Sequence, residues 1–333
     1  MLPVAFGCLA GGVLAAAAVS LNLPPSQIID HRAIDSAVVR FADTGFSGSV
    51  LVATDGKVRF SRNYGRSSRV NGVTDSYWIG SVTKSFTSAA ILRLRAERRL
   101  SLADSIGHFF SDAPYEKTGI TIRQLLTHTS GIDGNYAGTG IASRGAAVQA
   151  ILARPMSSPP GSHYRYMDDD YELLAAIVEI ASGTSWESFV RREFMAKVRL
   201  RHTSFWPGSD WSHKGANGMA STPEDLLRWT LALHKERILS RQDARDLMSG
   251  QIYVRTERGE DVYYGFGVRV YEAGGQTLEV MHSGSSDDNN NVIARVLADG
   301  TTVIVMSSAG DHSGTTWSSY VARNLPVHFR RVH

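Results

Sequence analysis

The sequence predicts an α/β protein of the α+β type, with an antiparallel sheet flanked by helices, built from both chain ends, and an inserted, mostly helical domain. Three observations predict this class. Strand-like segments occur before residue 80, residues 81–249 are mainly helical, and strand-like segments return after residue 250. The sheet domain is therefore expected to comprise residues 26–80 and 250–333, and the helical domain residues 81–249.

The composition is that of a globular protein. The 333 residues are 43% hydrophobic, which is enough for a large core. The 35 basic and 32 acidic residues give a net charge of +3, and the basic residues are scattered apart from short clusters such as 93–99 that also contain acid. We therefore expect no nucleic-acid partner. The oligomeric state does not follow from the sequence.

Residues 1–25 are expected to be a signal peptide or an N-terminal anchor. No side chain in residues 1–29 is charged, and the apolar run is about long enough to span a bilayer. A cleaved signal is preferred to an uncleaved anchor or a buried segment. The protein is then exported, either periplasmic or secreted, or membrane-anchored, with membrane association only through residues 1–20. Cys8, the sole cysteine, lies here and excludes an internal disulfide.

A helix and a β-hairpin are expected near the N-terminus. The runs 48–54 and 57–62 are rich in strand-forming residues and are separated by Asp55-Gly56, a typical hairpin turn. An antiparallel sheet therefore begins before residue 81. The preceding helix is predicted over residues 26–42, because apolar residues recur there at helical spacing: Ile28, Ile29, Ile34, Val38 and Phe41.

The central part is expected to contain several helices, among them residues 83–99, 120–126, 171–181 and 226–233. Asp168, Asp169 and Asp170 stand at the N-terminal end of the third, where acidic side chains are favoured. Thr222, Pro223 and Asp225 precede the fourth and predict a capping box with proline in the first turn.

The C-terminal part is expected to return to strands and to close with a helix over residues 315–324. Gly265-Phe266-Gly267 is interpreted as a strand fragment and not as a phosphate loop. The predicted strands cover residues 262–271, 278–281, 291–296 and 302–306.

Ser81 and Lys84 are the candidate catalytic pair. Ser81 stands at the start of the predicted helix, beside unpaired backbone N–H groups. Lys84 lies one turn further on the same face, so its amine can reach the serine hydroxyl. A serine with a neighbouring base is what acyl transfer through a covalent intermediate requires. Chance alone can supply this spacing, so the interpretation depends on the other motifs.

Those motifs occur in an order typical of the serine β-lactamase and penicillin-binding-protein superfamily. The chain resembles its class C β-lactamase-related branch, which includes DD-peptidases and esterases, from about residue 27 to 325. The resemblance implies a β-lactamase/transpeptidase-like fold. The matching segments are WIGSVTKSFT (78–87), ITIRQLLTHTSGI (120–132), PG (160–161), YRYMD (164–168), GMAST (218–222) and HSG (282–284).

By this resemblance Ser81 is the nucleophile, Lys84 its neighbouring base, and Tyr166 the second-motif tyrosine that relays a proton. The backbone N–H groups of Ser81 and Ser285 would form the oxyanion hole. His128, within residues 120–132, is expected to be structural. The residues expected to bind substrate are Asp168 and the third motif, His282, Ser283 and Gly284.

Three features depart from the usual pattern of the family. Asp168 stands where an Asn is frequent; its charge could pair with Lys84, although an N-cap role is the preferred interpretation. His282 replaces a lysine in the third motif, and a neutral histidine binds a carboxylate less strongly. Residues 285–291, SSDDNNN, replace a glycine-containing turn.

The sequence therefore predicts a serine hydrolase that cleaves an ester or amide of a small molecule or peptide through a Ser81 acyl-enzyme. No metal or organic cofactor is expected, because no motif for one is present. The departures favour an esterase-like or general hydrolase over a true class C-like β-lactamase. A DD-peptidase or penicillin-binding protein is another alternative. Outside the enzymes, the alternative is a catalytically inactive, penicillin-binding-like binding protein.

Overall fold

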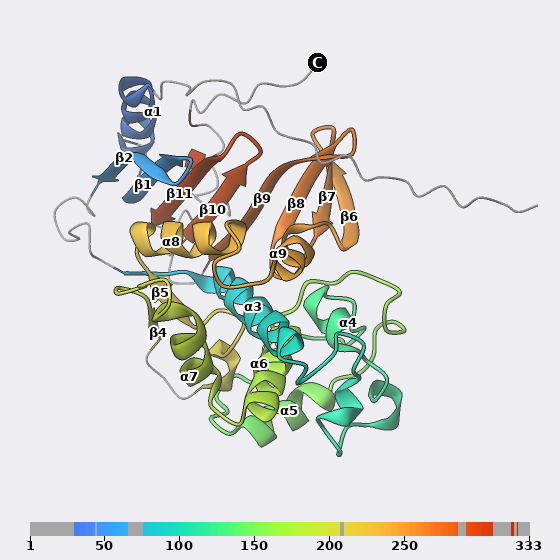
Figure 1. Ribbon diagram of the computed structural model, residues 1–333. Coiled ribbons are helices and arrows are strands. Elements are labelled where there is room, and N and C mark those ends of the chain that lie inside the picture. Colours follow the sequence, from blue (N-terminus) through green and yellow to red (C-terminus); the bar gives the residue numbers. More distant parts are fainter. Residues whose placement is uncertain are drawn as a thin grey trace, which may run out of the picture.

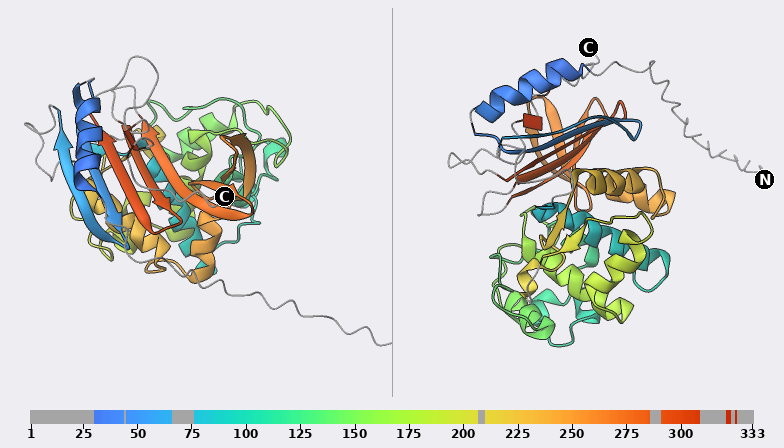
Figure 2. Two further views of the ribbon diagram at one scale, coloured as in Figure 1. Left: turned by 90° about the horizontal axis from the view of Figure 1, so that it is seen from above. Right: turned by 90° about the vertical axis from the view of Figure 1, so that its left-hand side faces the viewer.

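The computed structural model describes residues 30–43, 45–65, 76–206, 210–285, 291–308, 321–322 and 325. The predicted N-terminal signal or anchor, most of the closing helix and positions 286–290 lie outside these residues. An antiparallel sheet of eight strands has helices on both of its faces (Figures 1 and 2), which confirms the predicted α/β class.

The two ends of the chain meet inside the sheet. β1 (Gly48–Thr54) pairs with β2 (Lys57–Tyr64) as the predicted hairpin, and on its other side with β11 (Thr301–Ser307). The strand order is β2-β1-β11-β10-β9-β8-β7-β6. The other strands are β6 (Ile252–Glu257), β7 (Glu260–Tyr264), β8 (Arg269–Ala273), β9 (Gln276–Ser285) and β10 (Asn291–Leu297).

Both faces of the sheet are buried. On β1, Val50 and Val52 face the core under α1 (His31–Asp43), whereas Leu51 and Ala53 face the core of the helical part. Figure 2 shows α1 lying across one face and the helical part beneath the other. A strand that is buried on both faces has apolar residues at consecutive positions. Residues 48–54 therefore do not alternate between polar and apolar side chains.

The segment predicted as one strand over residues 262–271 is two strands joined by a bend. Gly265-Phe266-Gly267 forms this bend between β7 and β8, so its interpretation as a strand fragment was wrong. Gly267 has a φ of +77°, and a Cβ there would lie 2.9 Å from the backbone oxygen of Lys84. The bend therefore needs glycine because it packs directly on the helix that carries Lys84.

The helical part surrounds α3 (Thr83–Ala96), which is buried along most of its length. Helix α8 (Pro223–His234) also lies against the sheet, on β1, β10 and β11 (Figure 1). A small sheet, β3-β5-β4, lies beside these helices. The other elements are α4 (Ile122–Leu126), α5 (Arg144–Leu152), α6 (Asp168–Ser182), α7 (Trp186–Val190), α8 (Pro223–His234), α9 (Arg241–Met248), β3 (Tyr77–Trp78), β4 (Ser204–Phe205) and β5 (Met219–Ser221).

Two tryptophans fix the position of α3. Trp186 Nε1 donates to Thr87 Oγ1 at 3.1 Å, and Trp229 Nε1 donates to Ser85 Oγ at 2.9 Å. The Trp229 ring also stacks on Phe86, with centroids 3.7 Å apart. Polar side chains in a buried helix need such partners, and these two bonds supply them while holding the helix between its neighbours.

The predicted capping box at α8 is only half formed. Thr222 Oγ1 accepts from the Asp225 N–H at 3.2 Å, as an N-cap should. The Asp225 carboxylate, however, accepts from the His202 N–H at 2.7 Å and from Thr203, so it ties the preceding loop to the helix. A reciprocal box occurs instead at α4, between Thr121 and Gln124.

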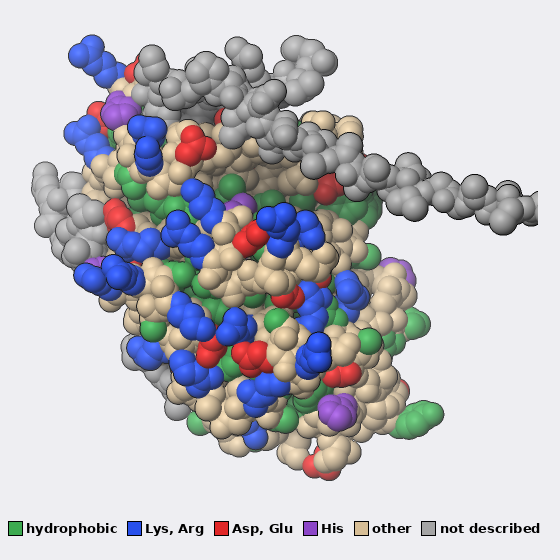
Figure 3. Space-filling view, in the orientation of Figure 1, with side chains coloured by type: hydrophobic (Ala, Val, Ile, Leu, Met, Phe, Trp, Pro, Cys, Tyr) green, Lys and Arg blue, Asp and Glu red, His purple; other side chains and the backbone are tan. Residues whose placement is uncertain are grey.

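The face in Figure 3 carries Lys and Arg side chains spread over it, with Asp and Glu between them. Across the described part of the chain, no single helix is both long and apolar enough to cross a membrane. Helix α6 and the segment Trp186–Val198 pass that test only as a pair, and they meet at a 75° bend.

Candidate active site

Ser81 lies in a short 3-10 turn, Gly80–Val82, that leads directly into α3. This turn is made possible by Gly80, which has a φ of +49°. Lys84 follows in the first turn of α3 and is fully buried. Its Nζ donates to Ser81 Oγ at 3.0 Å, so the predicted pair is in direct contact.

Lys84 donates to three acceptors, the number that an ammonium group can supply. Besides Ser81 Oγ, these are Asp168 Oδ1 at 2.5 Å and the backbone oxygen of Ala216 at 3.2 Å. Burial by itself would lower the pKa of Lys84, but the Asp168 carboxylate and Tyr166 outweigh it and hold this pKa above its usual value. Lys84 is therefore a cation that touches the candidate nucleophile.

Asp168 begins α6, but its carboxylate does not cap this helix. It accepts from Lys84 and, through Oδ2, from Asn217 Nδ2 at 3.1 Å. Asn135 Oδ1, from another loop, accepts from the N–H groups of Asp168 and of the following residue, at 2.8 and 3.3 Å. The preferred N-cap interpretation of Asp168 was therefore wrong, and the alternative pairing with Lys84 is what the structure contains.

Tyr166 lies next to Lys84, in the loop before α6. The Lys84 Nζ is 4.8 Å from the centre of the tyrosine ring. The Tyr166 hydroxyl is buried and has no hydrogen-bond partner among the residues that the structure describes. Such a group is costly to bury and is satisfied once a further polar group reaches it. The role of this hydroxyl in proton transfer stays a prediction.

The third motif reaches the site on β9, which passes directly beside Ser81. At Gly284 a Cβ would lie 2.0 Å from the Ile79 oxygen and 3.0 Å from the Gly80 Cα. His282 is buried, and Ser285 is exposed at the end of the strand. The oxyanion-hole and substrate-binding roles of the residues on β9 stay predictions.

Behind this site runs a buried polar chain that sequence reasoning did not find. His128 Nδ1 lies 3.0 Å from Asp170 Oδ2, and its Nε2 lies 3.1 Å from Tyr264 OH. Tyr264 OH lies 3.5 Å from His282 Nε2, and His282 Nδ1 lies 2.7 Å from the oxygen of Ser283. The only signal was the position of His128 in the 120–132 motif, since contacts among distant residues leave no local pattern.

Glu172, one turn into α6, is a second feature that the sequence did not reveal. It is fully buried, and neither carboxyl oxygen has a partner within the described part of the chain. A Cβ at Gly138 would lie 2.4 Å from Glu172 Oε2, so that loop passes closely over the carboxyl group. Burial, together with Asp169 and Asp168, raises the pKa of Glu172 to about 9, which leaves it uncharged at neutral pH.

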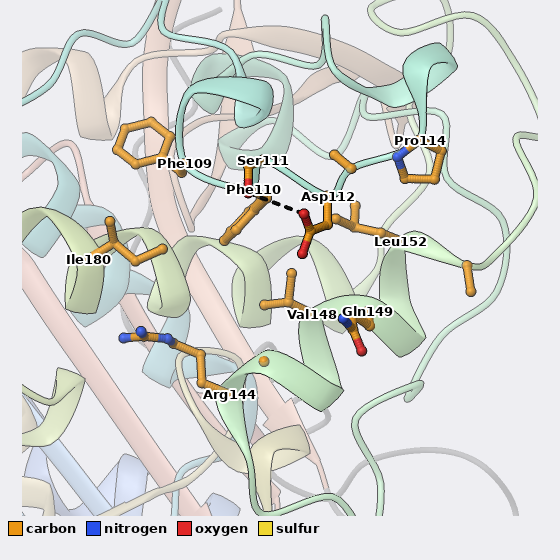
Figure 4. A pocket seen from close by; sticks show the side chains of 13 residues that line it. Phe109, Phe110, Ser111, Asp112, Pro114, Arg144, Val148, Gln149, Leu152 and Ile180 are labelled. Atoms are coloured by element: carbon orange, nitrogen blue, oxygen red, sulfur yellow. Dashed lines mark hydrogen bonds between the residues drawn. The ribbon is translucent and has the colours of Figure 1, made fainter.

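A pocket of about 330 Å³ lies away from these residues, between residues 109–114 and α5. Figure 4 shows it lined mainly by Phe109, Phe110, Val148 and Leu152, with Arg144 nearby. None of its lining residues belongs to the Ser81 site. Within the described ranges, no group of three His, Cys, Asp or Glu side chains is placed to hold a metal ion.

Comparison with known proteins gives a consistent result. The Beta-lactamase family model matches residues 34–321. Protein flp of Staphylococcus aureus (strain MRSA252) is 30% identical over 191 residues, which are 53% of this chain and 38% of flp. The chain spans well under half the length of the curated relatives it matches first, 42% and 38%.

Two solved structures share the fold. The octameric penicillin-binding protein homologue from Pyrococcus abyssi has a TM-score of 0.76 at 23% identity, over 88% of this chain and 76% of that one. The penicillin binding protein from Bacillus halodurans has a TM-score of 0.74 at 20% identity, over 87% of this chain and 98% of that one. The predicted β-lactamase/transpeptidase-like fold is confirmed.

Replacing Gly284 by alanine is expected to displace β9 from the turn that carries Ser81. The new Cβ would overlap backbone atoms, which cannot rotate away. We expect kcat/KM for any turned-over substrate to fall about 100-fold, the cost typical of a 1 Å misplacement. Gly119→Ala is the matched control, because a Cβ there meets nothing within 4 Å. Equal activity of the two variants would contradict the close approach.

Replacing Glu172 by glutamine is expected to flatten the dependence of stability on pH. The native carboxyl has its pKa raised to about 9 from 4.5, so it keeps a proton that the unfolded chain releases. The free energy of unfolding of the wild type should then fall between pH 4.5 and 9, by at most about 1.4 kcal/mol per pH unit.

Urea unfolding at pH 5.5 and pH 8 measures this difference. Glu172→Gln should lose less stability between the two conditions than the wild type, whereas the exposed Glu97→Gln should match the wild type. A Glu172→Gln variant with the wild-type dependence would show that Glu172 does not hold the proton.

Proposed function

This chain belongs to the Beta-lactamase family, and from that premise we propose that it is a serine hydrolase that cleaves an ester or amide through an acyl-enzyme on Ser81. The observation that carries the proposal is the contact between Ser81 Oγ and the buried Lys84 ammonium, at 3.0 Å. A cation beside the hydroxyl lowers the cost of the negative charge that forms on oxygen during attack.

Acylation begins with attack of Ser81 Oγ on the carbonyl carbon of the substrate. Lys84 Nζ first gives a proton to Asp168 Oδ1, 2.5 Å away, and the amine that this leaves takes the Ser81 hydroxyl proton. Lys84 is thus a cation again once Oγ has attacked, and Asp168 holds a proton that an asparagine could not accept. The substrate oxygen gains charge and is stabilised by backbone N–H groups, for which those of Ser81 and Ser285 are proposed.

The leaving group departs with a proton from Tyr166. Its hydroxyl has no partner within the described residues, and its ring lies against Lys84, so the proton returns to it through Lys84 from Asp168. The net result is a Ser81 ester and a protonated leaving group. Water then attacks this ester, and the same groups move a proton in the reverse direction to free Ser81.

Hydrolysis by the full chain is expected to require the Ser81 hydroxyl. We propose to assay a p-nitrophenyl ester, a chromogenic cephalosporin and a fluorescent penicillin with the wild type and Ser81→Ala. Ester turnover should fall at least about 1,000-fold in the variant, because no other group there can form the acyl-enzyme. Ser76→Ala, on the exposed segment before the site, is the matched control.

The outcomes separate the alternatives. Rapid cephalosporin turnover would favour a β-lactamase, and penicillin labelling without ester turnover would favour a penicillin-binding protein. Wild-type protein that turns over none of the substrates and takes up no label would contradict the hydrolase and favour a binding protein.

Replacing Asp168 by asparagine is expected to make activity depend on pH in the neutral range. Without the carboxylate, burial is the dominant effect on Lys84 and lowers its pKa, so the neutral amine becomes the base. Activity of the variant should fall as pH drops and Lys84 takes up a proton. We expect kcat/KM to fall at least about tenfold more between pH 9 and pH 6 in the variant than in the wild type.

The matched control is Asp169→Asn, whose carboxylate accepts from the Ala137 N–H and makes no hydrogen bond to Lys84. It should keep the wild-type profile. An Asp168→Asn profile that superimposes on the wild type would show that Asp168 does not set the protonation of Lys84.

A further inference from the structure

The Tyr264 hydroxyl joins two buried histidines that come from different parts of the fold. It lies 3.1 Å from His128 Nε2 and 3.5 Å from His282 Nε2. His128 also contacts Asp170 on α6, and His282 belongs to the strand edge beside Ser81. The hydroxyl at the end of β7 therefore connects the start of α6 with the strand that flanks the candidate nucleophile.

Backbone partners at the two ends fix where the protons lie. The Ser283 oxygen can only accept, so His282 Nδ1, at 2.7 Å, must carry its proton. The Met167 N–H can only donate, so His128 Nδ1, at 3.3 Å, must accept. A neutral His282 then presents a lone pair at Nε2, and a neutral His128 presents an N–H at Nε2.

Tyr171 also lies within reach of the Tyr264 side chain, but between the two histidines these tautomers leave one direction for the hydrogen bonds. His128 Nε2–H donates to the tyrosine oxygen, and the tyrosine O–H donates to His282 Nε2. At the far end, a protonated Asp170 donates to His128 Nδ1. Each hydrogen bond in this row of side chains is thus donated in the same direction, from Asp170 toward the Ser283 oxygen.

The charge environment agrees with this order. Burial holds the pKa values of both histidines well below their usual range, and it raises the pKa values of Asp170 and Tyr264. These directions favour the uncharged form of each of the four groups. The groups that face His282 are Tyr264, Tyr166, His128, Arg269 on β8 and Lys84 on α3. The two cations, Arg269 and Lys84, oppose a charge on its ring.

We propose that Tyr264 determines specificity by occupying His282 Nε2, so that the site selects uncharged esters and amides and disfavours substrates with a carboxylate at this strand edge. Both nitrogens of His282 are already used, one by the Ser283 oxygen and one by the Tyr264 hydroxyl. A carboxylate needs a donor, and this ring has none to offer. The inference rests on the proposed function of Ser81.

The proton order can be tested without any substrate. In the full chain with ¹⁵N-labelled histidines, NMR should show His282 as the Nδ1–H tautomer and His128 as the Nε2–H tautomer. Neither ring should change charge between pH 5.5 and 8.5, while the exposed His108 serves as an internal reference. The opposite tautomer, or a charged ring for either residue at pH 7, would overturn the proposal.

The specificity can be tested with two benzoylglycyl esters that differ in one group, the leaving alcohol being lactate or lactamide. We expect the wild type to prefer the uncharged lactamide ester at least about tenfold in kcat/KM, the size of one hydrogen bond to a charged group. Tyr264→Phe leaves His282 Nε2 free to take a proton when a carboxylate lies beside it. The ratio of kcat/KM for the lactamide ester to that for the lactate ester should then fall at least about fivefold at pH 6 but not at pH 9.

Tyr263→Phe, one residue earlier on the same strand, should keep the wild-type preference. A wild-type preference for the lactate ester, or a ratio unchanged by Tyr264→Phe, would overturn the assignment. Failure of the wild type to cleave either ester would contradict the hydrolase itself, and the tautomers would still decide whether the proton order is correct.

Discussion

The ion pair between Lys84 and Asp168 is the constraint on which the site depends. Two buried charges 2.5 Å apart need each other, because either one left alone in the core would carry a desolvation cost of several kcal/mol. Lys84 lies on α3 and Asp168 on α6, so the pair fixes one helix against the other. Trp186 and Trp229, which donate hydrogen bonds to α3, and Asn135, which accepts from the first N–H groups of α6, keep both partners in place.

Burial and the neighbouring charges determine which side chains around Ser81 carry a proton. Asp168 keeps Lys84 charged, whereas burial favours the uncharged forms of Glu172, Asp170 and the two buried histidines. The charges that the described residues bring to Ser81 and its partner are those of Lys84 and Asp168, which a nucleophilic serine can use. The surrounding uncharged groups contribute hydrogen bonds and shape.

Local patterns in the sequence predicted the parts of the fold that local chemistry determines. The Asp55-Gly56 hairpin and the helix after Ser81 are confirmed, and so is the superfamily that the ordered motifs predicted. The predictions failed where a contact distant in sequence overrides the local preference. Asp168 is typical of an N-cap but is recruited by Lys84, 84 residues away, and the Gly265 bend is shaped by its packing on α3. The hydrogen-bonded side chains of Asp170, His128, Tyr264 and His282 come from four separate segments, so no local sequence pattern predicts their contacts.

The pairing of β1 with β11 has a consequence for how the chain is made. A ribosome synthesises β1 about 250 residues before its partner, since Leu51 lies opposite Ile304 in the sheet. Until then β1 presents an unpaired edge, the kind of edge that joins other chains. The strand beside Ser81, β9, follows Ser81 by about 200 residues, so the site is completed only after β9 has been made. The free edge of β1 in the nascent chain is therefore open to pairing with other chains until β11 has emerged.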